Sequence, residues 1–351
     1  MKTRHPTDQA LQWRSPARRF RPAHHHPALL IELARSRRVA DHLLLRHTGL
    51  FMDDILRGDA LLSDSQYRQL LLNVETQHPG AELALLWGRQ FFPGHYGALS
   101  TLIHNSRHLQ QALECIQQYR HLACPLVTPR WVTDGRWCYL VWIDSSGAGG
   151  ARHFASVAMM AAVYGLFRHR TGTGSEWHYY LAGPVTKSQA DYRVNLGDRL
   201  HTGTGINLMI LPREDLFRRW SDSSETLFTV AWHQLSNTNH HFEALGLPEV
   251  IYRFLLRAVD QPITLEQTAA AFDISPSSLK RQLALCDTRF RSLLDEARFH
   301  HSLYLSHIRG LSTEQIAERL SNGDRTNFRR SFRRWTGMTP AQYREQLDPG
   351  H

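Results

Sequence analysis

Hydrophobic residues recur at helical spacing through the first third of the chain. From about residue 27 to residue 118 apolar positions repeat every three or four residues, and the clearest face consists of Leu109, Ala112, Leu113, Ile116 and Tyr119. This spacing places the apolar side chains on one side of a helix. The pattern therefore predicts amphipathic helices packed on a common core.

The next part of the chain favours strands. Arg130–Thr133 and Arg136–Ile143 flank Asp134-Gly135, a dipeptide typical of a two-residue hairpin turn in which both positions need positive φ. In the second strand Trp137, Tyr139 and Val141 alternate with Cys138, Leu140 and Trp142, so both faces are apolar and we expect both to be covered. A buried helix near 152–170, strands near 176–181 and 206–211, and a helix near 223–235 complete a mixed α+β domain.

The last third is helical throughout and contains a near-repeat. Thr264–Ala269 recurs as Ser312–Ala317, and both copies have the hydroxyl and glutamine spacing of a capping box, which satisfies free backbone N–H groups where a helix begins. A short polar break and a second amphipathic helix follow each copy. The pattern predicts two helix-turn-helix units, at about 264–285 and 312–335, joined by one long helix at about 290–308.

The second helix of each unit has an outer face suited to DNA. In the first unit Ser275 and Pro276 predict the helix start, Leu279 and Leu283 point inward, and Ser277, Lys280 and Arg281 lie outward. In the second unit Asp324 can cap a helix with Phe328, Phe332 and Trp335 inside. Its outer positions carry five arginines and no acid (Arg325, Arg329, Arg330, Arg333 and Arg334), a pattern that favours nucleic acid over a merely solvated face.

Composition limits the classes of protein that fit. The chain has 351 residues, 42% of them hydrophobic, which is enough for two domains. No apolar run approaches the ~20 residues of a membrane span, so we expect a cytoplasmic protein without a membrane segment. The four cysteines follow no short metal or disulfide spacing, and we expect no metal and no cofactor.

Charge and proline usage suggest how the chain is divided. The net charge is +9, and the excess of basic residues lies near the two ends while the middle is nearly neutral. Residues 1–27, rich in arginine, histidine and proline, predict a flexible basic arm. Residues 28–235 then form the α+β domain, 236–247 a linker and 248–347 an all-α DNA-binding domain.

The stretch from about Pro248 to Leu347 resembles the DNA-binding domain of the AraC/XylS family of bacterial transcription regulators. The most specific stretch is Phe328–Arg344, which carries two phenylalanines four residues apart, Gly337, Pro340 and Tyr343 at the spacing of the family motif. Ile274–Leu283 and Phe290–Arg298 are similar to the family's first recognition helix and linker helix. Two departures stand out: Asp273 and Ser321-Asn322 occupy turn positions where the family has glycine, and aspartate tolerates a left-handed backbone.

The resemblance implies roles for individual residues. It implies base contacts from the two recognition helices: Ser277, Lys280, Arg281, Arg325, Thr326, Asn327 and Arg330. It leaves phosphate contacts, which fix register without reading sequence, to Arg329, Arg333 and Arg334. Promoter DNA and RNA polymerase are the partners that it implies.

The first two thirds also resemble a known domain. Leu85–Arg89, Pro93–Leu99 and His108–Glu114 are similar to the amino-terminal domain of the ornithine-utilisation-regulator branch of that family, which is arabinose-binding-domain-like. The resemblance implies an α+β effector-binding or dimerisation domain, and an activator more often than a repressor. A domain that only forms a homodimer, or that is gated by a partner protein, stays open as an alternative.

An enzyme is the competing class of function. The chain contains no nucleophile elbow, no phosphate-binding loop, no zinc-protease motif and no complete dinucleotide-binding motif. We therefore expect a sequence-specific DNA-binding regulator without catalytic residues, and the sequence does not identify its effector.

Overall fold

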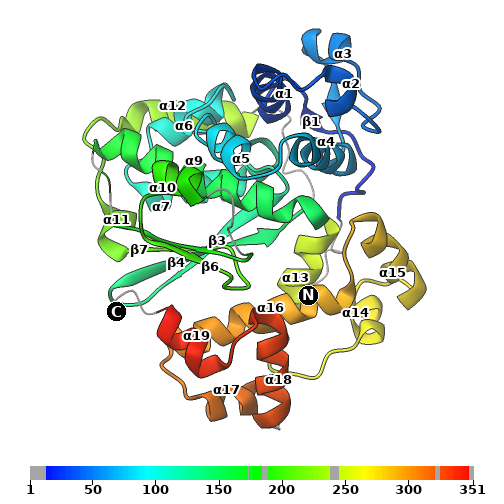
Figure 1. The fold of residues 1–351 in the computed structure, drawn as a ribbon, viewed down its shortest axis with the longest axis vertical. Helices are drawn as coiled ribbons and strands as arrows, with labels where there is room; N and C mark the ends of the chain where they lie inside the picture. The colour runs from blue at the N-terminus through cyan, green and yellow to red at the C-terminus, as the bar shows by residue number, and fades with distance from the viewer. Residues whose placement is uncertain are drawn as a thin grey trace, which may run out of the picture.

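The computed structural model describes residues 13–172, 174, 176–183, 189–237, 245–320 and 325–347. It contains an α+β domain followed by an all-helical region with two helix-turn-helix units, as the sequence predicts (Figure 1). Within these residues no helix combines the length and the apolar character that crossing a bilayer requires.

A five-stranded sheet forms the centre of the molecule, in the order β3-β4-β7-β5-β6. The strands are β3 (Val127–Thr133), β4 (Trp137–Asp144), β5 (His178–Leu181), β6 (Leu200–Thr202) and β7 (Leu208–Pro212). All neighbours are antiparallel except β5 and β6, which are parallel. A separate two-stranded sheet pairs β1 (Arg21–Pro22) with β2 (Leu61–Leu62).

Helices of the first domain lie on one side of the large sheet, and α7 and α9 pack on β3 (Figure 1). The helices of this domain are α1 (His26–Ser36), α2 (Asp41–Leu44), α3 (Met52–Leu56), α4 (Asp64–Gln77), α5 (Glu82–Gly88), α6 (Ala98–His104), α7 (Leu109–Gln118), α8 (Arg120–Ala123), α9 (Arg152–Thr171), α10 (Gln189–Leu196), α11 (Arg213–Phe217) and α12 (Glu225–Asn237). The long helix α9 is buried along most of its length and packs closely on α5. A Cβ on Gly88 would lie 2.0 Å from the carbonyl oxygen of Ala158, so Gly88 permits the close packing of α5 on α9.

The helical region covers the opposite face of the sheet. Its helices are α13 (Leu247–Arg257), α14 (Leu265–Ala271), α15 (Pro276–Leu285), α16 (Phe290–Leu303), a π-helical turn (Tyr304–Ile308), α17 (Thr313–Arg319), α18 (Arg325–Thr336) and α19 (Pro340–Gln346). Cys138, Leu140 and Trp142 of β4 face the core of the first domain, whereas Tyr139 and Val141 belong to a cluster with side chains of the second unit. The prediction that β4 is covered on both faces is confirmed, and the second cover is the helical region itself.

The β3–β4 hairpin forms where expected, but its turn differs from the prediction. Neither Asp134 nor Gly135 has a positive φ, so Asp134-Gly135 is not the central pair of a mirror-image turn. Instead Asp134 Oδ1 accepts hydrogen bonds from the backbone N–H groups of Arg136 (2.7 Å) and Trp137 (2.6 Å). The aspartate side chain therefore closes the turn, which is the role aspartate commonly takes.

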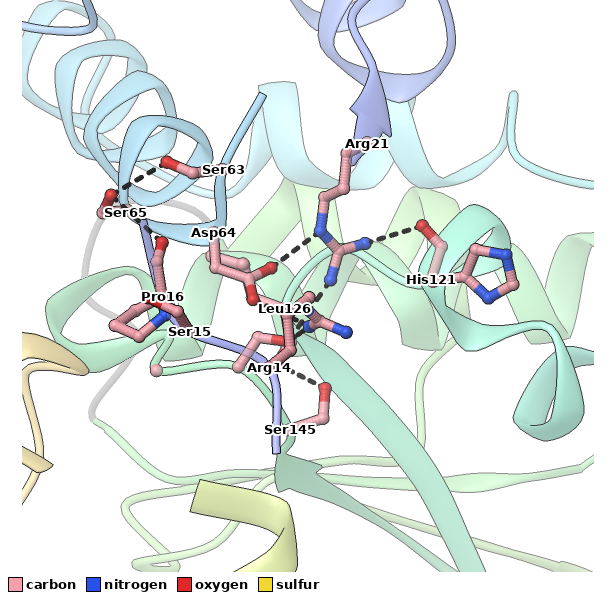
Figure 2. A network of polar contacts seen from close by, with 12 residues as sticks. Arg14, Ser15, Pro16, Arg21, Ser63, Asp64, Ser65, His121, Leu126 and Ser145 are labelled. Carbon is pink, nitrogen blue, oxygen red and sulfur yellow. Dashed lines mark hydrogen bonds and ion pairs between the residues drawn. The ribbon is translucent and has the colours of Figure 1, made fainter. Parts of the chain in front are cut away.

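The prediction of a flexible arm is wrong for residues 13–27, while residues 1–12 lie outside the described part of the chain. Arg14 and Arg21 are buried and both donate to the Asp64 carboxylate, each at 2.8 Å (Figure 2). Arg21 also donates to the carbonyl oxygens of His121 and Cys124. These bonds fix the segment, and helix α1 already begins at His26.

Candidate DNA-binding site and its contact with the first domain

The first helix-turn-helix unit is built from local capping bonds. Thr264 Oγ1 accepts from the N–H of Gln267, and Gln267 Oε1 accepts from the N–H of Thr264, so both predicted partners of the capping box are in place. Ser275 caps α15 by accepting from the N–H of Ser278 at 3.1 Å. Asp273 stands in the turn with φ at 54°, a left-handed backbone that aspartate tolerates.

Helix α15 presents the predicted residues to solvent. Leu279 and Leu283 are buried beneath the helix, and this orientation leaves Ser277, Lys280 and Arg281 exposed on its outer side. In helix-turn-helix proteins the residues near the start of the recognition helix contact the base edges. The exposed side chains of α15 occupy that part of the helix.

The second unit has the same construction. Ser312 and Gln315 form the reciprocal capping bonds that begin α17. In α18 Phe328 and Phe332 are buried and Trp335 is half-buried, as predicted. The predicted cap Asp324 and the departure Ser321-Asn322 lie outside the described residues.

All the arginines predicted on the outer face of α18 are exposed, but they differ in their partners. Arg325 forms an ion pair with Glu314 of α17, and Arg334 makes two bonds of 3.0 Å to the carboxylate of Asp295 on α16. Across the described residues Arg329, Arg330 and Arg333 form no ion pair. Exposed pairs contribute little stability and open readily, so Arg325 and Arg334 stay accessible to another anion.

Glycines bring the first domain onto the end of each recognition helix. A Cβ on Gly147 would lie 2.4 Å from the carbonyl oxygen of Cys286, the residue that ends α15. A Cβ on Gly205, in the β6–β7 turn, would lie 2.7 Å from Cα of Thr336 at the end of α18. The first domain therefore touches the carboxyl ends of α15 and α18 and leaves their amino ends exposed.

Polar contacts join the two domains between these glycines. Arg152, at the start of α9, forms an ion pair with Glu296 of α16 and donates to the carbonyl oxygen of Trp142 at 3.1 Å. Beside the first unit, Trp13 Nε1 donates to Gln282 Oε1 of α15 at 2.8 Å. Sequence reasoning missed these contacts because the partners are far apart in the chain, and no local pattern pairs them.

Comparison with known proteins decides the family. A profile described as the arabinose-binding domain of AraC transcription regulator, N-term, matches residues 40–219, and a helix-turn-helix profile matches residues 268–346. The chain belongs to the AraC family of transcription regulators. The AraC-family resemblance and the absence of an enzyme class are thereby confirmed, since its relatives are transcription regulators.

Several regulators are similar to this AraC-family chain. The ornithine utilization regulator of Pseudomonas aeruginosa is 26% identical over 287 residues, which covers 81% of this chain and 84% of that protein. The regulator VirS of Mycobacterium tuberculosis is 40% identical over 80 residues, 22% of this chain and 23% of its own. The crystal structure of the transcriptional regulator CdpR from Pseudomonas aeruginosa aligns with a TM-score of 0.44 at 19% identity, over 91% of this chain and 97% of that one.

Proposed function

We propose that this DNA-binding regulator recognises a promoter through both units together and that a small-molecule effector on the first domain sets its activity. Support comes from two recognition helices with exposed amino ends and from a first domain that matches an arabinose-binding profile. The nearly neutral charge of the first domain favours a role other than binding nucleic acid. As for most of the family, we propose activation of transcription through contact with RNA polymerase, in the bacterial cytoplasm.

The exposed, acid-free face of α18 is the observation that carries this proposal. We propose that the recognition helices read base edges through Ser277, Lys280, Arg281, Arg325, Thr326, Asn327 and Arg330. Arg329, Arg333 and Arg334 then hold phosphates, which set the position of the protein on the duplex. Arg325 and Arg334 exchange their carboxylate partners for DNA in this arrangement.

The test is a selection of binding sites from a pool of random duplex DNA by the full chain at fixed salt. We expect enrichment of one sequence with two half-sites about one helical turn, ~34 Å, apart, since one chain carries both recognition helices. An enriched site with only one half would show that a single unit reads DNA. Absence of enrichment would contradict sequence-specific binding.

The name of the Pseudomonas aeruginosa relative refers to ornithine, and this suggests a class of effector. We propose that the effector of this chain is a small nitrogen-containing metabolite of the amino-acid type. The choice between activator and repressor is tested by transcription in vitro from the selected promoter, with and without the effector.

A homodimer is the second candidate role of the first domain, and helix α12 favours it. Leu227 and Val230 of α12 are about half exposed, at 50% and 47%, although both are aliphatic. We propose that these side chains meet the same helix of a second copy. Sedimentation of the full chain tests the proposal, because Leu227→Glu should convert a dimer to a monomer.

A further inference from the structure

Three arginines gather around one carboxylate where α16 meets α18. Arg291 and Arg298 lie seven positions apart in α16, and Asp295 lies between them on the same face of the helix. Asp295 Oδ1 is 3.3 Å from Arg291 Nε and 3.0 Å from Arg334 Nη2 of α18. We call Arg291, Arg298 and Arg334 the α16 arginine cluster. Its three positive charges exceed the single negative charge of Asp295, so the group carries a net charge of +2.

Arg298 is the member of the cluster without an anionic partner. Among the described residues its side chain forms neither an ion pair nor a hydrogen bond, and its Nε is buried. Burial lowers the pKa of Arg298, and the like charges of Arg291 and Arg334 lower it further. A half-buried guanidinium group without a partner is costly, and an anion beside it removes that cost. Phosphate is a suitable anion, because its oxygens match the two-pronged geometry of guanidinium.

The cluster lies on the outward side of α16. Glu296 and His300 are on the other side of the helix, where Glu296 pairs with Arg152 and His300 lines a small cavity against β3 and β4 of the first domain. Ala297 packs in the core of the first helix-turn-helix unit and Phe299 in that of the second. The remaining side of α16, which carries the arginines, therefore lies between the two units and faces away from the first domain.

The cluster also continues the outer face of α18. Arg330 and Arg334 are four positions apart in this helix, and both are exposed. A duplex that binds both recognition helices presents two successive major grooves, and phosphate chains border the minor groove between them. Because α16 joins the two units, we expect its outward side to meet these phosphates.

We propose that the α16 arginine cluster binds backbone phosphates of the DNA between the two half-sites. The inference rests on the proposed function and extends its phosphate contacts to Arg291 and Arg298, which lie outside both recognition helices. Phosphate oxygens replace Asp295 as the partner of Arg291 and Arg334, and Arg298 gains an anion. Such contacts carry no sequence information. They hold the two units in position on the duplex and leave the choice of bases to α15 and α18.

The experiment compares two duplexes that contain the selected site. One is unmodified, and in the other uncharged methylphosphonates replace the phosphates between the half-sites. Titrations of the full chain at several salt concentrations measure the affinity and its salt dependence. We expect roughly tenfold weaker binding to the modified duplex, because charged hydrogen bonds are lost. The salt dependence should become shallower by about one unit of slope for each phosphate contact that is lost.

Variants of the cluster connect this loss to the named residues. Arg291→Gln and Arg298→Gln should each weaken binding to selected and random DNA by a similar factor, and methylphosphonates should then cost much less than in the parent chain. Asp295→Asn should tighten binding, because it removes the carboxylate that competes with phosphate. The matched control is Arg309→Gln, an exposed arginine outside the cluster, which should behave as the parent chain does.

Three results would overturn the inference. The first is equal affinity of the parent chain for the two duplexes. The second is parent-like binding by the arginine variants; if Arg298→Gln fails to fold, Arg291→Gln decides, since Arg291 is 61% exposed. The third is weakening by Asp295→Asn as large as that by Arg298→Gln, which would assign this face a structural role only.

The failure of this inference can be distinguished from failure of the proposed function. A selected site together with any of these three results refutes the phosphate contacts of α16 alone. If no site is selected, sequence-specific recognition is refuted, and the arginine variants are then titrated against random duplex DNA. A shallower salt dependence there supports the cluster, and an unchanged one refutes it as well.

Discussion

Asp64 joins two buried arginines, Arg14 and Arg21, which both also donate to the hydroxyl of Ser146 (Figure 2). Asp64→Asn removes the charge that compensates both guanidinium groups without opening a cavity. We expect a loss of about 3–5 kcal/mol in the free energy of unfolding, measured by chemical denaturation, because unpaired buried charges are costly. Asp41→Asn, which breaks the exposed pair with Arg35, should cost less than about 1 kcal/mol. Equal losses in the two variants would contradict the burial of this network.

His300 makes the free energy of unfolding depend on pH. Burial lowers its pKa to about 3, whereas an unfolded chain binds the proton near the ordinary value of 6.5. The unfolded state therefore takes up a proton first, and this contribution to stability is fully present above pH 6.5 and is lost as the pH falls toward 3. The expected slope is about 1.4 kcal/mol per pH unit for one proton.

Denaturation at several pH values between 7 and 4 measures this slope. His300→Gln keeps a polar partner for the Tyr252 hydroxyl, which lies 2.8 Å from His300 Nδ1, and should flatten the dependence. His233 is exposed, and His233→Gln should leave the pH dependence of the free energy of unfolding as in the parent chain. If the free energy of unfolding of His300→Gln changed with pH as steeply as that of the parent chain, His300 would not be the source of the dependence.

DNA recognition by α18 depends on which side of this helix faces solvent. Phe328 and Phe332 fix the rotation of the helix and hold Arg330 in solvent. Arg330→Ala should weaken binding to the selected site by about 1–3 kcal/mol while affecting random DNA much less, if the guanidinium reads a base. Titrations of both duplexes at several salt concentrations measure the difference.

The matched control for α18 is Arg309→Ala, an exposed arginine outside both recognition helices. It should change the two affinities little. Equal weakening of specific and random binding by Arg330→Ala, with a shallower salt dependence, would assign Arg330 to a phosphate.

The relative position of the two domains depends on the contact between the sheet and the DNA-binding units. Gly203 and Gly205 share one turn and nearly the same φ, 70° and 71°, but a Cβ on Gly203 meets nothing within 4 Å whereas one on Gly205 meets the backbone of Thr336 at 2.7 Å. Alanine strains the turn at either position. Only Gly205→Ala should also displace the end of α18 from the first domain.

Calorimetry and DNA titration of the two glycine variants test this contact. We expect Gly205→Ala to separate the unfolding of the two domains into distinct transitions and to change affinity for the selected site. Gly203→Ala should keep a single transition at a slightly lower temperature. Identical behaviour of the two variants would show that the contact does not couple the domains.

Local chemistry explains what the sequence alone determined. The capping boxes at Thr264 and Ser312, the helix start at Ser275 and the alternating faces of β4 each depend on residues a few positions apart, so a pattern reveals them. The family motif around α18 is equally local. Two helix-turn-helix units, an α+β first domain and the candidate base-reading residues could all be predicted in this way.

Only the tertiary structure shows the ion pairs within and between the domains, because the paired residues are distant along the chain. Arg14 and Arg21 look like solvated charges until Asp64, 50 and 43 positions away, is placed between them. Arg152 meets Glu296 across 144 positions, and no local pattern pairs the two. The sequence predicts that both faces of β4 are covered, but only the folded chain shows that the DNA-binding units cover one of them. The reason is that the hydrophobic effect is non-directional, so an apolar face does not determine which segment of the chain buries it.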